Sequence, residues 1–475
     1  MAQQVRDKNQ EIFETMPIPR ALFTLAIPTI IGQLIILIYN MADTFFIGRT
    51  GNPLMVAGVS LILPVFNICV SLAGLVGVGG GTLISRLLGA QRRHEAGKVS
   101  SFCFWLCILI AAAFSIVMLL FMNPVLRLLG ASDQIIGFAR QYAFLVIVIG
   151  GIPTVLSMTM GNLLRSVGCA REAGFGVSMG GVINIFLDPL FMFVLLPKDY
   201  EIVGAGMATA LSNVISCGYF LTMILRLTRK GGSGSGEAQV SSTAASLSLS
   251  PRAGLPDAEL IRQIFFVGVP AAIATFLFDL AYIVIDKLTS NYGDIPLAAI
   301  GIVLKVERLP LNVGIGLCQG MMPIAAYNYS AKNFPRMRKV VNFSRLAGIT
   351  FGAVAVTLYE IFAPQIMSVF IGDPETIRIG TDFLRVRCLA TPFMFMCFHL
   401  VNMFQAVGRG DRALLLAVVR WAVFNIPMLF LFDRIFGMYG IVWTQISADI
   451  CTVIVSFLVY RHFEKTVLQP QEKGL

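Results

Sequence analysis

The chain has 475 residues, of which 56% are hydrophobic and only 13% are charged. Since an ordinary soluble domain carries about 25% charged residues, this composition excludes a protein whose main solvent is water. The formal net charge of +10 raises the alternative of nucleic-acid binding, which depends on where the charges lie.

Apolar stretches long enough to cross a bilayer as helices, about 20 residues each, recur along the chain. They are too long and too uniformly apolar for the alternating strands of a membrane barrel. We therefore predict an all-α integral membrane protein of twelve transmembrane helices. The predicted helices begin at Ala21, Leu54, Ser100, Tyr142, Ala173, Ile202, Leu260, Ile295, Val340, Cys388, Ala413 and Gly437.

Lysine and arginine concentrate in alternate connectors between these helices. Arg92 and Arg93 follow the second predicted helix, and Arg336 and Arg338 follow the eighth, whereas the opposite connectors carry fewer basic residues. Because basic residues favour the cytoplasmic side, we predict a multi-pass protein of the plasma membrane (bacterial inner membrane) with both termini cytoplasmic. The positive charge thus orients the chain, and we expect no nucleic-acid partner.

A stretch rich in Gly and Ser divides the predicted helices into two sets of six. It runs over residues 229–257, and such low-complexity sequence is typical of a flexible linker. We predict an N-lobe of six helices in residues 1–228, a flexible cytoplasmic linker at 229–257, and a C-lobe of six helices in residues 258–475.

The two sets of helices repeat one another. Pro28 in LAIPTII matches Pro270 in VGVPAAI, and Asn184 matches Asn425 at nearly the same separation along the chain. Because each set has an even number of helices, both sets enter the membrane from the same side, and the repeats are parallel. A central cleft between two pseudo-symmetric six-helix bundles is the expected consequence.

The sequence lacks the phosphate-binding loop of an ATP-driven pump and the HExxH motif of a zinc hydrolase. Its only Gly-Lys pair, Gly97 and Lys98, is followed by Val99 in place of the Ser or Thr of a phosphate-binding loop. The sequence contains no HExxH motif, and the nine cysteines form no CxxC pair. We expect no enzymatic activity, no cofactor and no metal other than a transported Na⁺.

Polar side chains inside the first set of helices are informative, because a charge costs on the order of 3 kcal/mol at the bilayer centre. Asp43 ends the first predicted helix. Asn184 and Asp188 lie four residues apart on one face of the fifth. Thr209 adds a hydroxyl at similar depth in the sixth. Such oxygens ligate hard cations, and the acids could instead bind protons.

A plainer interpretation stays open for both acids. Asp43 would then only cap a helix end near Gly48, and Asp188 would only satisfy backbone groups freed by Pro189. Two acids at similar depth, together with Asn184, favour the cation site.

The second set of helices does not duplicate these oxygens, because the counterpart of Asp188 is Leu429. This asymmetry indicates that ion coupling belongs to the N-lobe. The charged residues to note in the seventh and eighth predicted helices are Asp279, Asp286, Lys305, Glu307 and Arg308. We expect the last three, which are close together in the eighth helix, to form an internal ion-pair group.

Several segments carry a family resemblance over essentially the whole chain. They are LAIPTII followed by ADTFFIG, RLLGAQ after the second predicted helix, NIFLDP in the fifth, GAGMAT in the sixth and PIAAYNYSAKN in the eighth. In this order, on a repeat of six plus six helices, they resemble the multidrug and toxic compound extrusion (MATE) family.

The resemblance implies a V-shaped pair of six-helix lobes. It also implies export of organic, often cationic and amphipathic compounds by antiport against Na⁺ or H⁺. The partners expected on this basis are small organic substrates, the coupling cation and the lipid bilayer, and we expect a monomer.

The resemblance also assigns residues. Pro28 matches the family proline at which the first helix bends, and Asp279 is the nearest candidate for an acid that one branch of the family places in the seventh helix. The acids, amide and hydroxyl of the family's N-lobe cation site carry over onto Asp43, Asn184, Asp188 and Thr209.

Two other functions stay open from the sequence. A flippase for lipid-linked oligosaccharides, from the same superfamily, needs a strongly basic central cavity to hold pyrophosphate. The first half has few membrane-embedded cations apart from Arg86. The other alternative is a membrane-embedded enzyme or receptor, and a dye-efflux assay would separate all three.

Overall fold

The computed structural model describes residues 8–232 and 246–473, and its elements there are helices without a single strand. Within these residues, nine helices are long and apolar enough to cross a membrane, and two further pairs of helices qualify if each bent pair is one span. The 37-residue helix α10 (Asp294–Ser330) is also long enough to cross. With α10, the predicted all-α membrane fold of twelve spans is confirmed.

The first half consists of a short helix, α1, and the helices of six spans. Their bounds are α1 (Lys8–Glu14), α2 (Ile18–Gly48), α3 (Pro53–Gly89), α4 (Arg93–Leu128), α5 (Ile136–Ala143), α6 (Gly151–Ser166), α7 (Ala170–Pro189) and α8 (Glu201–Gly232). Short π-helical segments join α5 to α6 at Phe144–Ile149 and extend α7 at Leu190–Leu195.

The second half repeats this order and ends in a short helix. Its bounds are α9 (Ala258–Thr289), α10 (Asp294–Ser330), α11 (Phe334–Phe370), α12 (Pro374–Cys388), α13 (Thr391–Ala406), α14 (Gly410–Val418), α15 (Ile426–Phe436), α16 (Met438–Phe463) and α17 (Gln469–Lys473). Further π-helical segments lie at Val419–Asn425, between α14 and α15, and at Glu464–Leu468.

Polar side chains cap the N-terminal ends of several of these helices, at positions where an apolar stretch of the sequence is interrupted. The Asn52 side chain accepts a hydrogen bond from the backbone N–H of Leu54 (3.0 Å) at the start of α3. Asp373 accepts from the backbone N–H of Thr376 (2.8 Å) at the start of α12. Each cap satisfies a backbone donor that has no partner inside the helix.

Two spans are bent rather than straight. The α5 and α6 segments meet at 47°, and α12 and α13 meet at 45°. The predicted start of the tenth span at Cys388 is therefore wrong, because that span begins with α12 at Pro374. Hydropathy misses α12 because it carries Arg385 and Arg387, and the second of these is buried inside the protein.

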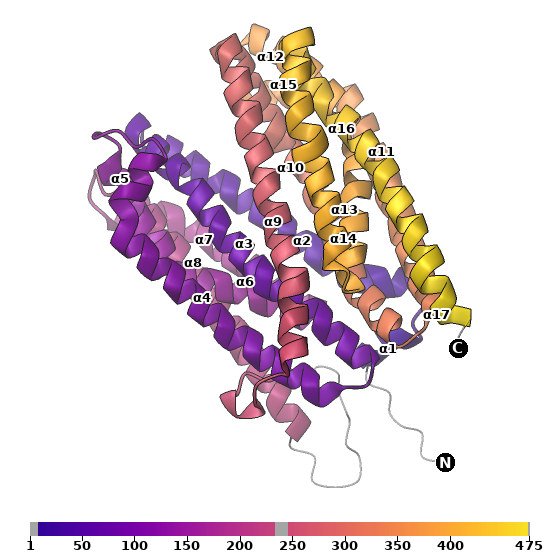
Figure 1. The fold of residues 1–475 in the computed structure, drawn as a ribbon. Helices are drawn as coiled ribbons and strands as arrows, with labels where there is room; N and C mark the ends of the chain where they lie inside the picture. The colour runs from indigo at the N-terminus through magenta and orange to yellow at the C-terminus, as the bar shows by residue number, and fades with distance from the viewer. Residues whose placement is uncertain (1–7, 233–245, 474–475) are drawn as a thin grey trace.

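The helices form two bundles that meet near one end and diverge toward the other (Figure 1). One bundle contains the helices of the first half, coloured indigo to magenta, and the other contains those of the second half, coloured rose to yellow. Helices α2 and α3 of the first bundle pack against α9 and α10 of the second. The first and last helices, α1 and α17, lie at the closed end (Figure 1).

Glycine allows the closest approach between the bundles, where α3 crosses α9. A Cβ atom at Gly268 would lie 2.0 Å from the carbonyl oxygen of Leu75, and one at Gly79 would lie 2.3 Å from the carbonyl oxygen of Ile264. Real Cβ atoms do not come so close to backbone atoms. The two helices can therefore touch only while both positions remain glycine.

We expect Gly268→Ala to destabilise the protein by about 1–3 kcal/mol, because the added methyl group must push α9 away from α3. The unfolding temperature of the purified protein in detergent measures this loss. Gly74→Ala on α3 is the matched control, since a Cβ there meets no atom within 4 Å. Equal unfolding temperatures for the two variants would contradict the proposed close contact.

Helix α1 ties the bundles together at the closed end. The buried ring of Phe13 stacks on Tyr327 of α10 with 4.9 Å between ring centroids. A Cβ at Gly168, in the first bundle, would lie 3.3 Å from the same Phe13 ring. Arg336 of α11 donates to the carbonyl oxygens of Phe13 and Met16, at 2.7 Å each. The first helix thus contacts both halves of the chain.

The predicted linker at 229–257 lies partly outside the described residues, at 233–245. The described part before α9 lies against α4. Ser101 donates to the carbonyl oxygen of Ser250 (2.7 Å), and the Trp105 indole donates to that of Leu249 (3.2 Å). The chain therefore contacts the first bundle before it enters α9.

Candidate cation site

Three of the four predicted N-lobe residues lie together between α7 and α8. The Asn184 amide donates to Asp188 Oδ1 (3.4 Å) and to Thr209 Oγ1 (3.3 Å). All three side chains are buried, and that of Asp188 is fully inaccessible. The four-residue spacing in α7 places Asn184 and Asp188 one turn apart on the face that meets Thr209.

Asp43, near the end of α2, joins this group through a tyrosine. The Tyr142 hydroxyl, from α5, donates to Asp43 Oδ2 (3.4 Å) and lies near Thr209. The two carboxyl groups, Asp43 and Asp188, are close enough to interact electrostatically. Four helices of the first bundle, α2, α5, α7 and α8, therefore contribute polar side chains to one cluster.

The cluster leaves three buried oxygens without a hydrogen-bond partner among the described residues. They are Asp43 Oδ1, Asn184 Oδ1 and Asp188 Oδ2. No ion pair found in the described parts of the chain includes Asp43 or Asp188. A buried carboxylate without a partner is costly, so a bound Na⁺ or a proton would stabilise this arrangement.

The hydrogen bonds of the two acids favour the cation-site interpretation over the plainer one. At the end of α2 the backbone N–H of Arg49 bonds to backbone carbonyl oxygens, and Asp43 instead contacts Tyr142 on another helix. Asp188 accepts from the Asn184 side chain rather than from backbone near Pro189. Neither acid is therefore explained by a helix end or a proline kink.

Tyr142 is the residue of this cluster that the sequence does not reveal, because it precedes an apolar run and has no fixed spacing to Asp43. We expect Tyr142→Phe to weaken binding of a cation at this cluster about fivefold, since one hydrogen bond to a carboxylate is lost. Cation-dependent stabilisation of the purified protein measures the effect. Tyr200→Phe, at an exposed tyrosine of the same bundle, should match the wild type, and an equal loss in both variants would contradict this role.

The predicted C-lobe acid, Asp279, lies apart from the N-lobe cluster. It is half-buried on α9 and lies near Asn67 of α3 and near Arg308. Asp286, seven residues further along the same helix, is exposed. Asp279 therefore lies at the contact between the two bundles.

The internal ion-pair group predicted within α10 is wrong. Lys305 and Arg308 are exposed, whereas Glu307 is buried and accepts from Arg387 of α12 at 2.8 and 2.9 Å. Because Glu307 and its neighbours point in different directions around the helix, only Glu307 enters the second bundle. Its counter-ion comes from the segment that hydropathy misses.

Pro28 lies inside α2, which runs as one helix from Ile18 to Gly48. A Cβ at Gly174 of α7 would lie 2.4 Å from the carbonyl oxygen of Pro28. The helix that carries Asn184 and Asp188 therefore contacts α2 where proline removes a backbone hydrogen bond.

The described residues contain no group of three or more His, Cys, Asp or Glu side chains that could hold a metal ion. The cysteines other than Cys169 have free thiols. The N-lobe cluster, with its carboxylate, amide and hydroxyl oxygens, is suited to a hard monovalent cation rather than a transition metal.

Comparison with known families decides the relationship of this two-bundle fold. The family model MatE matches residues 28–190 and again residues 270–431. The chain belongs to the MatE family. Each match begins at a proline of the repeat, Pro28 or Pro270, and one match lies in each half, so the internal repeat is confirmed.

Two relatives of the chain come from staphylococci. Multidrug export protein MepA of Staphylococcus saprophyticus is 28% identical over 457 residues, covering 96% of each chain. MepA of Staphylococcus aureus is 28% identical over 458 residues, again with 96% of each chain covered.

Solved structures share the fold of this MatE-family chain. A multidrug resistance MATE family transporter in an outward-facing conformation has a TM-score of 0.88 at 22% identity, over 98% of this chain and 99% of that one. A mutant of the Vibrio cholerae MATE transporter VcmN has a TM-score of 0.86 at 19% identity, over 95% and 98% of the two chains. The predicted two-lobe membrane fold is thereby confirmed.

Proposed function

We propose that the protein is a secondary active exporter of organic, often cationic and amphipathic compounds, driven by inward movement of Na⁺ or H⁺. The observation that carries the proposal is the N-lobe cluster, in which the buried Asp188 and the half-buried Asp43 have no basic partner among the described residues. Support also comes from the MepA relatives, which are named multidrug export proteins.

The coupling follows from the positions of the ligating side chains. Asp43 is on α2, whereas Asn184 and Asp188 are on α7. A cation held between them favours one packing of these helices, and α2 can bend at Pro28 because that residue lacks a backbone donor. Two of the similar structures are of a MATE in a bent and in a straight conformation. If substrate favours the other packing, each ligand weakens the other.

The remaining assignments belong to the same proposal. We place the lobes at residues 1–228 and 258–475, with the linker at 229–257 and both termini in the cytoplasm of a bacterial cell. The location of α1 and α17 at one end of the molecule supports placing both termini on the same side of the membrane (Figure 1). Asp279 is a candidate second acid, and a monomer suffices because each chain supplies both lobes.

The proposal is tested with the purified protein in liposomes that contain a fluorescent cationic dye. An Na⁺ gradient and a pH gradient are imposed separately, and dye movement is followed in each case. We expect one of the gradients to drive dye against its concentration difference, and an ionophore for that ion to stop it. Dye movement that neither gradient accelerates would contradict the proposal.

A further inference from the structure

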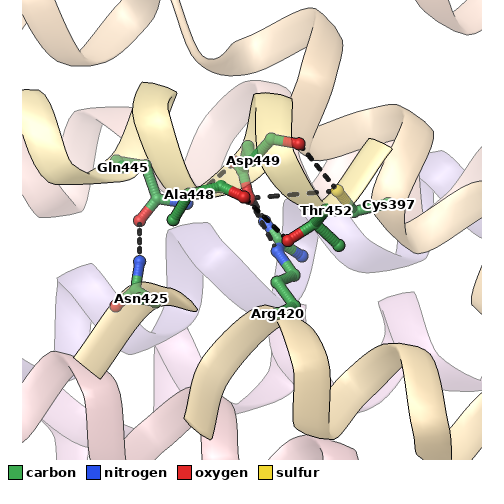
Figure 2. Close-up of polar contacts among 7 residues, drawn as sticks. All are labelled: Cys397, Arg420, Asn425, Gln445, Ala448, Asp449 and Thr452. Atoms are coloured by element: carbon green, nitrogen blue, oxygen red, sulfur yellow. Dashed lines mark hydrogen bonds and ion pairs between the residues drawn. The ribbon is translucent and has the colours of Figure 1, made fainter. Parts of the chain in front are cut away.

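The second bundle contains a buried ion pair that the proposed export mechanism leaves unexplained. Arg420, in the π-helical segment before α15, donates from Nε to Asp449 Oδ1 (2.8 Å) and from Nη2 to Asp449 Oδ2 (3.2 Å), as Figure 2 shows. The two side chains are 3% and 0% exposed. This bidentate geometry is the strongest arrangement in which arginine binds a carboxylate.

Aromatic rings hold the guanidinium in place. Its central carbon lies 4.6 Å from the ring centroid of Phe398 and 4.4 Å from that of Trp421. Contacts of a cation with ring faces are favourable, and arginine is the side chain best suited to them. The guanidinium of Arg420 is therefore fixed inside the second bundle by its carboxylate partner and by two aromatic rings.

Two amide side chains connect the Arg420–Asp449 ion pair to Asn425, the position in the C-lobe that corresponds to Asn184 of the N-lobe site. Gln445 donates to Asp449 Oδ2 (2.9 Å), and Asn425 donates to Gln445 Oε1 (3.3 Å), as Figure 2 shows. Asn425 is the repeat counterpart of Asn184. In both halves the amide of this asparagine donates to a side chain on the next span, Thr209 in one and Gln445 in the other.

The two corresponding asparagines also resemble each other in their unpartnered amide oxygens. Asn425 Oδ1 is buried without a hydrogen-bond partner among the described residues, as is Asn184 Oδ1. The two clusters differ in their charges, because the acids of the first have no basic partner in the described parts of the chain, whereas Asp449 is bonded to Arg420. Arg387, the other buried arginine nearby, is occupied by two hydrogen bonds to Glu307.

We infer that the Arg420 guanidinium is a resident cation, meaning a permanent positive charge of the protein itself. It occupies in the C-lobe the position that corresponds to the coupling-cation site of the N-lobe. The transporter then binds its coupling cation in one lobe only. A guanidinium does not lose its proton in proteins, so Asp449 stays neutralised throughout the transport cycle. This inference rests on the proposed function for the meaning of the N-lobe site, and it makes Arg420 a positioning residue that sets the coupling ratio.

Removal of the Arg420 guanidinium should create a second cation site in the second bundle. In Arg420→Gln, Asp449 and the oxygen of Asn425 would be free to bind Na⁺ or a proton, as Asp188 and Asn184 are in the first bundle. Binding of ²²Na⁺, and proton uptake in weakly buffered solution, are measured per mole of purified protein. We expect Arg420→Gln to bind about twice as much cation as the wild type, and Arg420→Gln with Asp449→Asn to return to the wild-type value.

A folded Arg420→Gln protein with wild-type stoichiometry would overturn the inference. If this variant is unstable, NaCl or acid should raise its unfolding temperature relative to choline chloride at neutral pH, and the double variant should show no such response. Instability that no cation relieves would also overturn it. Asp188→Asn separates the two claims: if it binds as much cation as the wild type, the N-lobe site is wrong, whatever Arg420→Gln shows.

Discussion

Asp188→Asn is expected to lower gradient-driven export at least about tenfold while the protein remains folded. Asparagine keeps the shape of the side chain and can still bond to Asn184, but it removes the charge that would hold the coupling cation. Interactions with a buried charged group contribute about 1.5–3 kcal/mol, which corresponds to a tenfold or larger change in affinity. Export into or out of liposomes under the driving gradient measures the loss, and Asp43→Asn should behave in the same way.

Asp199→Asn is the matched control for this experiment. It makes the same chemical change in the same bundle, but at an exposed turn residue whose positive φ of 77° asparagine tolerates. This variant should export at the wild-type rate. Undiminished export by Asp188→Asn and Asp43→Asn, at equal amounts of protein, would show that the ion is bound elsewhere.

The second large effect is expected at the buried pair between α10 and α12. Glu307→Gln leaves the Arg387 guanidinium, which is 1% exposed, without a counter-charge. Breaking a buried pair in this way costs about 3–5 kcal/mol. We therefore expect a large fall in the unfolding temperature of the purified protein.

Replacing both partners should recover most of that stability, because two apolar side chains of similar volume carry no desolvation penalty. Glu307→Met with Arg387→Met is the variant to compare. Asp133→Asn, which breaks an exposed pair with Arg127, should change the unfolding temperature very little. A double variant as unstable as Glu307→Gln would show that the ion pair stabilises the protein by more than the mutual compensation of its two charges.

Much of the fold could be predicted because the bilayer imposes length and polarity on every span. The repeat of Pro28 by Pro270 and of Asn184 by Asn425 also follows from the sequence alone. Within the site, Asn184 and Asp188 were predictable as neighbours because a four-residue spacing fixes their relation on any helix. Thr209 followed from its depth in the next span.

Partners that meet across helices could not be predicted, because no spacing relates them. Tyr142 reaches Asp43 from α5, and Arg387 reaches Glu307 from a helix too charged to show in hydropathy. Arg420 and Asp449 each stand alone in an apolar run, which is a signal of function by itself. That signal identifies each residue, but only the packing of the second bundle shows that they are bonded to each other.

We propose that the coupling cation binds at Asp43, Asn184, Asp188 and Thr209 and thereby weakens the binding of substrate. The most direct test is the affinity of the purified protein for a fluorescent substrate, measured as the concentration of the coupling cation is raised. Substrate affinity should fall with cation in the wild type and stay constant in Asp188→Asn. An equal cation dependence in the two proteins would show that the cation does not bind at this cluster.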